Sequence, residues 1–249
     1  MKKVFILFAA MMAGLCAMQA QTTFTFHIGG VMPTAKFAES DLDNGEWALI
    51  NENRKDGGAG LGVDLGLQWN FGIQSVNGLS ILFSVDAIAN TLNSDVKDFI
   101  DDVIDNAEDN GYDDASVTKP LYINIPIMVG ATYNYKFNES FGVFGEAALG
   151  LNIRDITNLK YSLEAGSYES SQTLDYKLAT TVAYRVGAGL VFNDKYTLGI
   201  SYWNLGAAKV NAKITDEVDG PSGHDKDTEK FKGKALTPTM AMLRVGFRF

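Results

Sequence analysis

Cysteine and histidine are nearly absent from this chain of 249 residues. Its single cysteine, Cys16, lies close to the N-terminus, and its two histidines are His27 and His224. If the N-terminal segment is removed as a leader, the mature chain has no disulfide or thiol chemistry available. Two distant histidines, neither followed by a serine and acid pattern, provide no spacing for a metal site or a catalytic triad. We therefore expect no metal, no cofactor and no enzymatic activity.

Long hydrophobic runs and an excess of positive charge are also missing. Beyond residue 20 no apolar run approaches the roughly 20 residues of a transmembrane helix. The chain has 21 Lys and Arg against 30 Asp and Glu, and loss of Lys2 and Lys3 with a leader would leave 19 against 30, a balance of −11. Because nucleic-acid binding needs clustered positive charge, this composition excludes nucleic acid as an expected partner.

The first 20 residues have the pattern of a secretory signal peptide. Lys2 and Lys3 form a short positive region, and an apolar stretch over 4–13 is followed by small residues. The stretch is too short to span a membrane. We expect cleavage after Ala20, with residues 21–249 forming one domain. Cleavage nearer Cys16, with lipidation there, is the alternative, although Leu15 stands where a small residue is expected.

Apolar residues alternate strictly with other residues in parts of this sequence, most clearly in its last ten residues. Because neighbouring side chains of a strand point to opposite faces, residues 240–249 form a strand with one apolar and one cationic face. A soluble sandwich would bury the apolar face, whereas a membrane barrel turns it to lipid and keeps polar groups inside. The apolar set is Ala241, Leu243, Val245, Phe247 and Phe249, and the other is Met240, Met242, Arg244, Gly246 and Arg248.

Eight segments show strand patterning, and the connections between them alternate in length. Transmembrane barrels have short periplasmic turns, long external loops and an even strand number. The sequence therefore predicts an all-β fold, a closed antiparallel up-and-down transmembrane β-barrel of about eight strands. The predicted strands are 23–32, 60–71, 79–90, 121–137, 141–155, 175–192, 196–210 and 240–249. The long loops are 33–59, 91–120, 156–174 and 211–235, and the short turns are 72–78, 138–140 and 193–195.

One long loop contains a helical pattern. Over 94–110 apolar residues recur with helical spacing from Val96 to Ala107, and aspartates largely cover the other face. We expect a short helix packed on the barrel rim, or an external contact element. The acidic stretch 105–114 lacks the spacing and the glycine of an EF-hand, which leaves only loose cation binding as an option.

These patterns resemble a known group of proteins. The loop order, the terminal Arg-Val-Gly-Phe-Arg-Phe over 244–249 and the Leu-Tyr-Ile-Asn-Ile-Pro-Ile over 121–127 are similar to those of small outer-membrane β-barrels. These are the porin-family or PorT-like barrels, with OmpA- and OmpX-type architecture. The resemblance implies a place in the cell outer membrane and contact with its lipid. It also implies recognition by the barrel-assembly machinery through Val245, Phe247 and Phe249.

Charged residues on the inward faces are the candidate interior site. Buried ions are costly unless paired, so we expect an interior salt-bridge network of structural character, with a small ion-selective pore as the alternative. The network residues are Asp64, Asp86, Glu146, Arg154, Arg185, Arg244 and Arg248.

Function is then expected in the external loops. The first hypothesis is a structural or binding barrel whose loops contact an unknown partner or ligand. The second is a narrow channel, or a conduit for small hydrophobic molecules with a lateral opening. A lipid-A-modifying enzyme is a weaker third, and a soluble lipocalin-like barrel, with apolar residues inside, is the rival fold.

Overall fold

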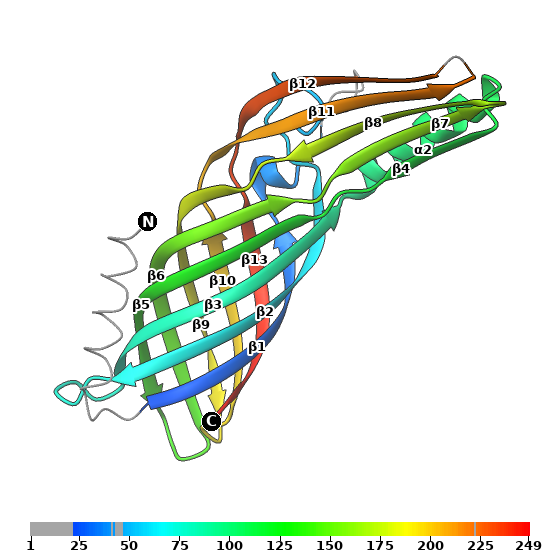
Figure 1. Ribbon diagram of the computed structural model, residues 1–249. Coiled ribbons are helices and arrows are strands. Elements are labelled where there is room, and N and C mark those ends of the chain that lie inside the picture. Colours follow the sequence, from blue (N-terminus) through cyan, green and yellow to red (C-terminus); the bar gives the residue numbers. More distant parts are fainter. Residues whose placement is uncertain (1–21, 41, 43–46, 222) are drawn as a thin grey trace.

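A computed structural model describes residues 22–40, 42, 47–221 and 223–249, so the predicted signal peptide lies outside the described residues. Eight antiparallel strands form a closed barrel in the order β1-β13-β10-β9-β6-β5-β3-β2 (Figure 1). The predicted fold class is confirmed, and each of the eight predicted strands overlaps one barrel strand. The barrel strands are β1 (Thr22–Pro33), β2 (Ala59–Gly72), β3 (Leu79–Leu92), β5 (Tyr122–Lys136), β6 (Phe141–Ile156), β9 (Ala179–Phe192), β10 (Tyr196–Asn204) and β13 (Thr239–Arg248).

The barrel is apolar outside and polar inside. Leu61 and Val182 on the outer surface are each 71% exposed, whereas the inward Asp64 and Arg185 are fully buried. This inverts the arrangement of a water-soluble barrel, so the lipocalin-like rival is wrong. Within the described part of the chain, no helix is long and apolar enough to span a membrane.

Pairing of the first and last strands closes the barrel. β1 and β13 run antiparallel with Phe26 opposite Phe247 and Gly29 opposite Arg244. The Phe249 amide donates to the Phe24 carbonyl at 2.7 Å, which extends the ladder to the last residue. Closure matters because a strand edge left unpaired in lipid would expose backbone groups with no water to satisfy them.

The two ends of the barrel differ. One end has only short turns, and we call it the turn end. The three residues 193–195 connect β9 and β10 there, and Asn193 and Asp194 take positive φ angles of 50° and 56° in this tight turn. Aromatic rings contact one another on the outer surface at this end, in two series. One runs Phe83–Trp69–Phe24–Phe249–Phe247–Tyr196 and the other Tyr135–Phe137–Phe141–Phe192.

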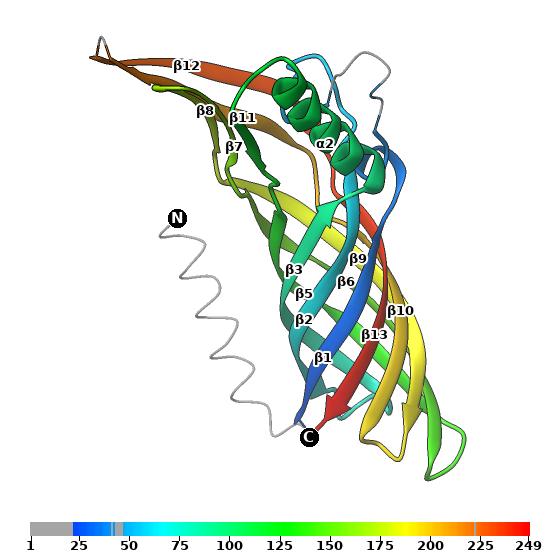
Figure 2. The ribbon, with the colours of Figure 1, turned by 90° about the vertical axis from the view of Figure 1, so that its right-hand side faces the viewer.

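At the opposite end, the loop end, the prediction of plain loops over 156–174 and 211–235 is wrong. These segments are hairpins that project beyond the barrel as a second sheet, in the order β12-β11-β8-β7-β4 (Figures 1 and 2). The sixth and seventh predicted strands therefore divide at 177–178 and 205–207 into a barrel strand and a sheet strand. The sheet strands are β4 (Asp114–Thr118), β7 (Leu159–Ala165), β8 (Tyr168–Tyr176), β11 (Ala208–Gly220) and β12 (Gly223–Leu236).

The helix predicted over 94–110 is confirmed as α2 (Ser94–Asp109), which lies beside β4 at the loop end (Figure 1). Asn93 caps its N-terminus by accepting a hydrogen bond from the Val96 amide at 2.9 Å. Val96, Ile100 and Ala107 are buried, as the apolar spacing predicts, and the aspartates are exposed. The short 3₁₀ helix η1 (Ala35–Phe37) follows β1.

Candidate functional site

The middle of the lumen holds a network of ion pairs. Arg244 of β13 pairs with Asp64 of β2, with Nε 2.9 Å from Oδ2, and its Nη2 also pairs with Asp86 of β3. Arg185 of β9 brings its Nη1 3.4 Å from Asp86 Oδ2 and its Nε 3.3 Å from Glu146 Oε1. These five residues come from five of the eight barrel strands, so the network ties opposite walls of the barrel together.

Neutral side chains complete the network. Gln68 Oε1 accepts a hydrogen bond from Arg185 Nη2 at 2.8 Å, and Ser84 donates to Asp86 Oδ2 at 3.0 Å. The Trp203 ring lies under both guanidinium groups, 4.8 Å from Arg185 and 5.4 Å from Arg244. Stacking on an aromatic face stabilises a desolvated cation, so Trp203 seals the network toward the loop end.

The network includes five of the seven predicted residues and leaves out two arginines. Arg154 lies at the loop end and donates to the backbone carbonyls of Leu236 and Ala208, each at 2.9 Å. Arg248 lies at the turn end, 3.3 Å from Asn134 Oδ1. All share the inward face, but Arg154 is eight residues along β6 from Glu146, or about 26 Å at the usual rise of a strand. Five of the seven residues therefore meet in one network, and Arg154 and Arg248 lie apart from it.

Sequence reasoning did not identify two members of the site. Gln68 lies four residues after Asp64 and so shares its inward face, yet nothing in the sequence pairs it with Arg185. Trp203 was not singled out, although it alternates with the outward Tyr202 and its position on the inward face follows from that. Which inward side chains meet across the lumen depends on how far neighbouring strands are offset along the barrel. The alternation within a single strand does not reveal that offset.

Gly66 leaves the space that the network occupies. A Cβ atom at this position would overlap Asp86 Oδ1 and crowd Arg244 Nη2. We expect Gly66→Ala to lower the free energy of unfolding by about 1–3 kcal/mol, the usual cost of overpacking. Chemical denaturation of the protein in lipid vesicles measures this. Gly30→Ala is the control, because no atom lies within 4 Å of the added Cβ there. Equal effects of the two variants would contradict the assignment.

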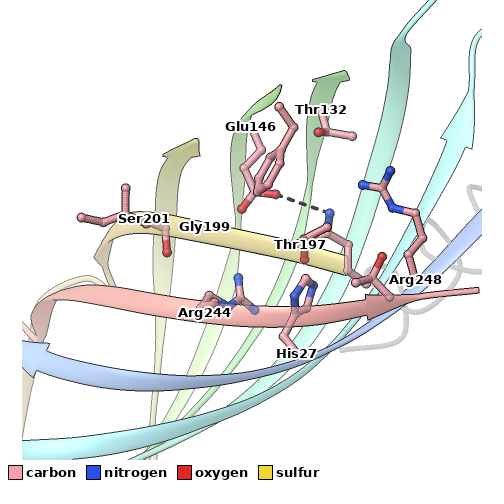
Figure 3. Close-up of a pocket in the computed structure, with 12 residues that line it drawn as sticks. His27, Thr132, Glu146, Thr197, Gly199, Ser201, Arg244 and Arg248 are labelled. Atoms are coloured by element: carbon pink, nitrogen blue, oxygen red, sulfur yellow. Dashed lines mark hydrogen bonds between the residues drawn. The ribbon is translucent and has the colours of Figure 1, made fainter. Parts of the chain in front are cut away.

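A small polar cavity adjoins the network, and its lining includes Thr25, His27, Thr197 and Arg248 (Figure 3). Its volume of about 20 Å³ for water-molecule centres is enough for about one water and far below that of an organic ligand. His27 is buried and has no carboxylate within ion-pair distance among the described residues. His224 pairs instead with Asp219 on the exposed hairpin of β11 and β12, 2.6 Å apart.

An apolar plug fills the loop end of the barrel. Phe37, Trp47 and Leu49 of the connection between β1 and β2 are buried in one cluster with Trp203 and Met240, which line the lumen. This segment was predicted only as a loop, and its apolar residues gave no period that would reveal their burial.

Hydrogen bonds hold the plug in place. Trp47 Nε1 donates to the Gly57 carbonyl at 2.9 Å, and the Tyr176 hydroxyl donates to the Leu49 carbonyl at 3.0 Å. Burial raises the pKa of the Tyr176 phenol well above its usual value, so the hydroxyl remains a donor. On the surface, hydrogen bonds to Glu39 and Asp56 raise the pKa of Lys36 and keep it charged.

The lumen is occupied by paired charges in its middle and by apolar side chains at its loop end. Among the residues that the structure describes, no group of three or more His, Cys, Asp or Glu side chains could hold a metal ion. The projecting sheet and α2 extend from the barrel at its loop end (Figure 2).

Comparisons with known proteins agree with this architecture. Residues 5–249 match the family model of the outer membrane protein beta-barrel domain. No curated protein matches the chain.

Several solved structures are similar to it. Ail of Yersinia pestis, solved with the heparin analogue sucrose octasulfate, is 14% identical, with a TM-score of 0.41 over 92% of this chain and 99% of Ail. A major outer membrane protein of Thermus thermophilus is 10% identical, with a TM-score of 0.44 over 92% of this chain and all of that one. OprG of Pseudomonas aeruginosa is 13% identical, with a TM-score of 0.40 over 92% and 97%.

Proposed function

The chain belongs to the outer membrane protein beta-barrel domain family, and on that premise we propose that it is a structural and binding barrel whose external loop end contacts a partner. It lies in the outer membrane. The observation that carries the proposal is the filled lumen, because ion pairs occupy its middle and the apolar plug occupies its loop end. A barrel of eight strands has an interior that side chains can largely fill, and the cavity left beside the ion-pair network has room for about one water.

The loop end offers the surface for such contact. α2 turns an acidic face to solvent, with Asp98, Asp102 and Asp105 exposed on it. The projecting sheet extends the same end away from the barrel. Opposite charge favours encounter and orientation, so a partner with a basic surface is the one that this face fits.

Site-specific crosslinking tests the proposal. We expect a photoreactive residue at Asp102 to give a discrete crosslinked product in intact cells, and one at Lys195, exposed at the turn end, to give none of that product. Replacing Asp98 and Asp105 with lysine should reduce the product, because it reverses charge on the contacting face. Absence of a discrete product at Asp102, or the same product from Lys195, would contradict a loop-end partner.

The alternative is a narrow channel or a conduit for small hydrophobic molecules. What weighs against a lateral opening is that all eight pairs of neighbouring barrel strands form antiparallel ladders. The ladder of β2 and β3 has a register shift between Ala59 and Gly62, at its loop end. A lipid-modifying enzyme would need a polarised nucleophile, and the described surroundings of His27 contain no carboxylate paired with it. Hydrolysis of labelled lipid A that is abolished by His27→Ala would support that third function.

A further inference from the structure

Basic side chains gather on one outer surface of this acidic protein. They lie where the projecting sheet joins the barrel, on β7, β11 and β12 and on the link between β8 and β9. All are exposed, and none has an ion-pair partner among the described residues. We call this set the lysine band: Lys160, Lys177, Lys209, Lys213, Lys230, Lys232 and Lys234.

Strand register puts members of the band side by side. Lys213 of β11 lies directly opposite Lys230 of β12, and Asp175 of β8 is its other neighbour. Residues directly opposite in antiparallel strands share a face, and like charges in that position repel. Glu217 on the same face is already paired with Lys226, farther out along the hairpin. Glu52 accepts a hydrogen bond from the backbone amide of Lys232 at 2.9 Å. With Asp175 and Glu52 beside seven lysines, the band keeps an excess of positive charge.

The band begins where the apolar outer surface ends. Leu178, at the start of β9, is 69% exposed and belongs to the outward face with Val182, and Lys177 immediately precedes it. Tyr176 and Leu159 point to the buried cluster instead, so Lys177 and Lys160 stand on the outer side of the chain. In an outer-membrane barrel the apolar surface is set in hydrocarbon, and residues directly beyond it lie at the depth of the lipid headgroups.

We propose that the lysine band binds phosphate groups of anionic lipid in the outer leaflet. At this depth the positively charged lysine amines are close to the negatively charged phosphates of the lipid headgroups. Lysine side chains are long enough to reach these phosphates while their methylene groups lie on the apolar surface. The acidic face belongs to α2, which packs beside β4 at the edge of the projecting sheet opposite β12. The inference does not depend on the partner proposed for that acidic face.

Lipid binding by matched variants tests the band. The folded mature chain in neutral detergent is titrated with fluorescent bisphosphorylated lipid A. The band variant is Lys213→Gln, Lys230→Gln and Lys232→Gln. The control variant is Lys55→Gln, Lys97→Gln and Lys119→Gln, also at the loop end but outside the band. Unchanged mobility shifts on boiling verify that both variants fold.

We expect the band variant to raise the Kd at least about tenfold, because each basic residue near an anionic surface contributes severalfold to binding. The control variant should stay within about twofold of the unmodified protein, as separated surface charges contribute little. Dephosphorylated lipid A should bind the unmodified protein weakly, and the difference between variants should vanish in high salt.

Three results would overturn the proposal. Equal Kd values for the band and control variants would show that these lysines do not contribute to lipid binding. Equal binding of phosphorylated and dephosphorylated lipid A would show that the protein does not recognise the phosphate groups. Soluble tripolyphosphate binding as tightly as lipid A, and displacing it, would assign the band to a soluble polyanion and not to the leaflet. If the triple variant fails to fold, Lys230→Gln alone is compared with Lys97→Gln.

Discussion

Replacing Arg244 with methionine is expected to lower the free energy of unfolding by about 3–5 kcal/mol, because removing one partner of a buried ion pair leaves its carboxylates uncompensated. Arg244 is 5% exposed and pairs with both Asp64 and Asp86, neither of which is solvated. Methionine retains most of the side-chain volume, so the loss of stability comes from the missing charge and not from a cavity. Urea unfolding of the protein in lipid vesicles, followed by tryptophan fluorescence, measures the change.

Arg248→Met is the matched control for this experiment. It changes the same residue type on the same strand, four residues away, where the guanidinium has a single hydrogen bond to Asn134 at 3.3 Å. We expect a loss of no more than about 1 kcal/mol there, the usual worth of one hydrogen bond. If both variants lose the same stability, the network does not hold the barrel walls together.

Replacing Trp47 with alanine is expected to release the plug. Trp47 is buried in the loop-end cluster and donates a hydrogen bond to Gly57. Truncating a buried tryptophan costs about 3–5 kcal/mol, and the variant also loses the hydrogen bond to Gly57. Amide hydrogen exchange measured by mass spectrometry should therefore quicken strongly over residues 47–58, while the barrel strands stay protected.

Trp69→Ala separates this local effect from a general one. Trp69 lies on the outer surface at the turn end, between Phe24 and Phe83. Its loss should leave exchange over residues 47–58 unchanged. Protection of the plug that persists in Trp47→Ala, or that falls equally in Trp69→Ala, would show that Trp47 does not anchor the plug.

The barrel strands were predictable because the membrane imposes a simple pattern on them. In β13 every second residue is apolar, and the structure places Leu243 outside and Arg244 inside as the alternation predicts. β12 has no such pattern, since Lys226, Asp227 and Lys230 put charge on both of its faces in water. A strand that is exposed on both faces has no alternating apolar residues. Because the barrel strands were predicted from that alternation, the segment that contains β12 was predicted as a loop.

The site was predictable in its residue types but not in its contacts. Inward phase identified Asp86, Glu146 and Arg185, because charged residues on a barrel strand belong inside. Which of them meet depends on their heights along tilted strands, and Arg154 shares the face of Glu146 without sharing its height. The plug was beyond prediction, because Trp47 is buried by the tertiary path of an irregular segment and not by any local period.

Single-channel recording in a planar lipid bilayer tests the central claim, that the lumen is closed, most directly. The folded mature chain is inserted alone, and a general porin inserted in the same bilayer system serves as the positive control. Ion pairs in the middle of the lumen and the apolar plug at its loop end predict no steady conductance from the unmodified protein. Discrete, reproducible conductance steps from pure protein would contradict the account and establish the barrel as a channel.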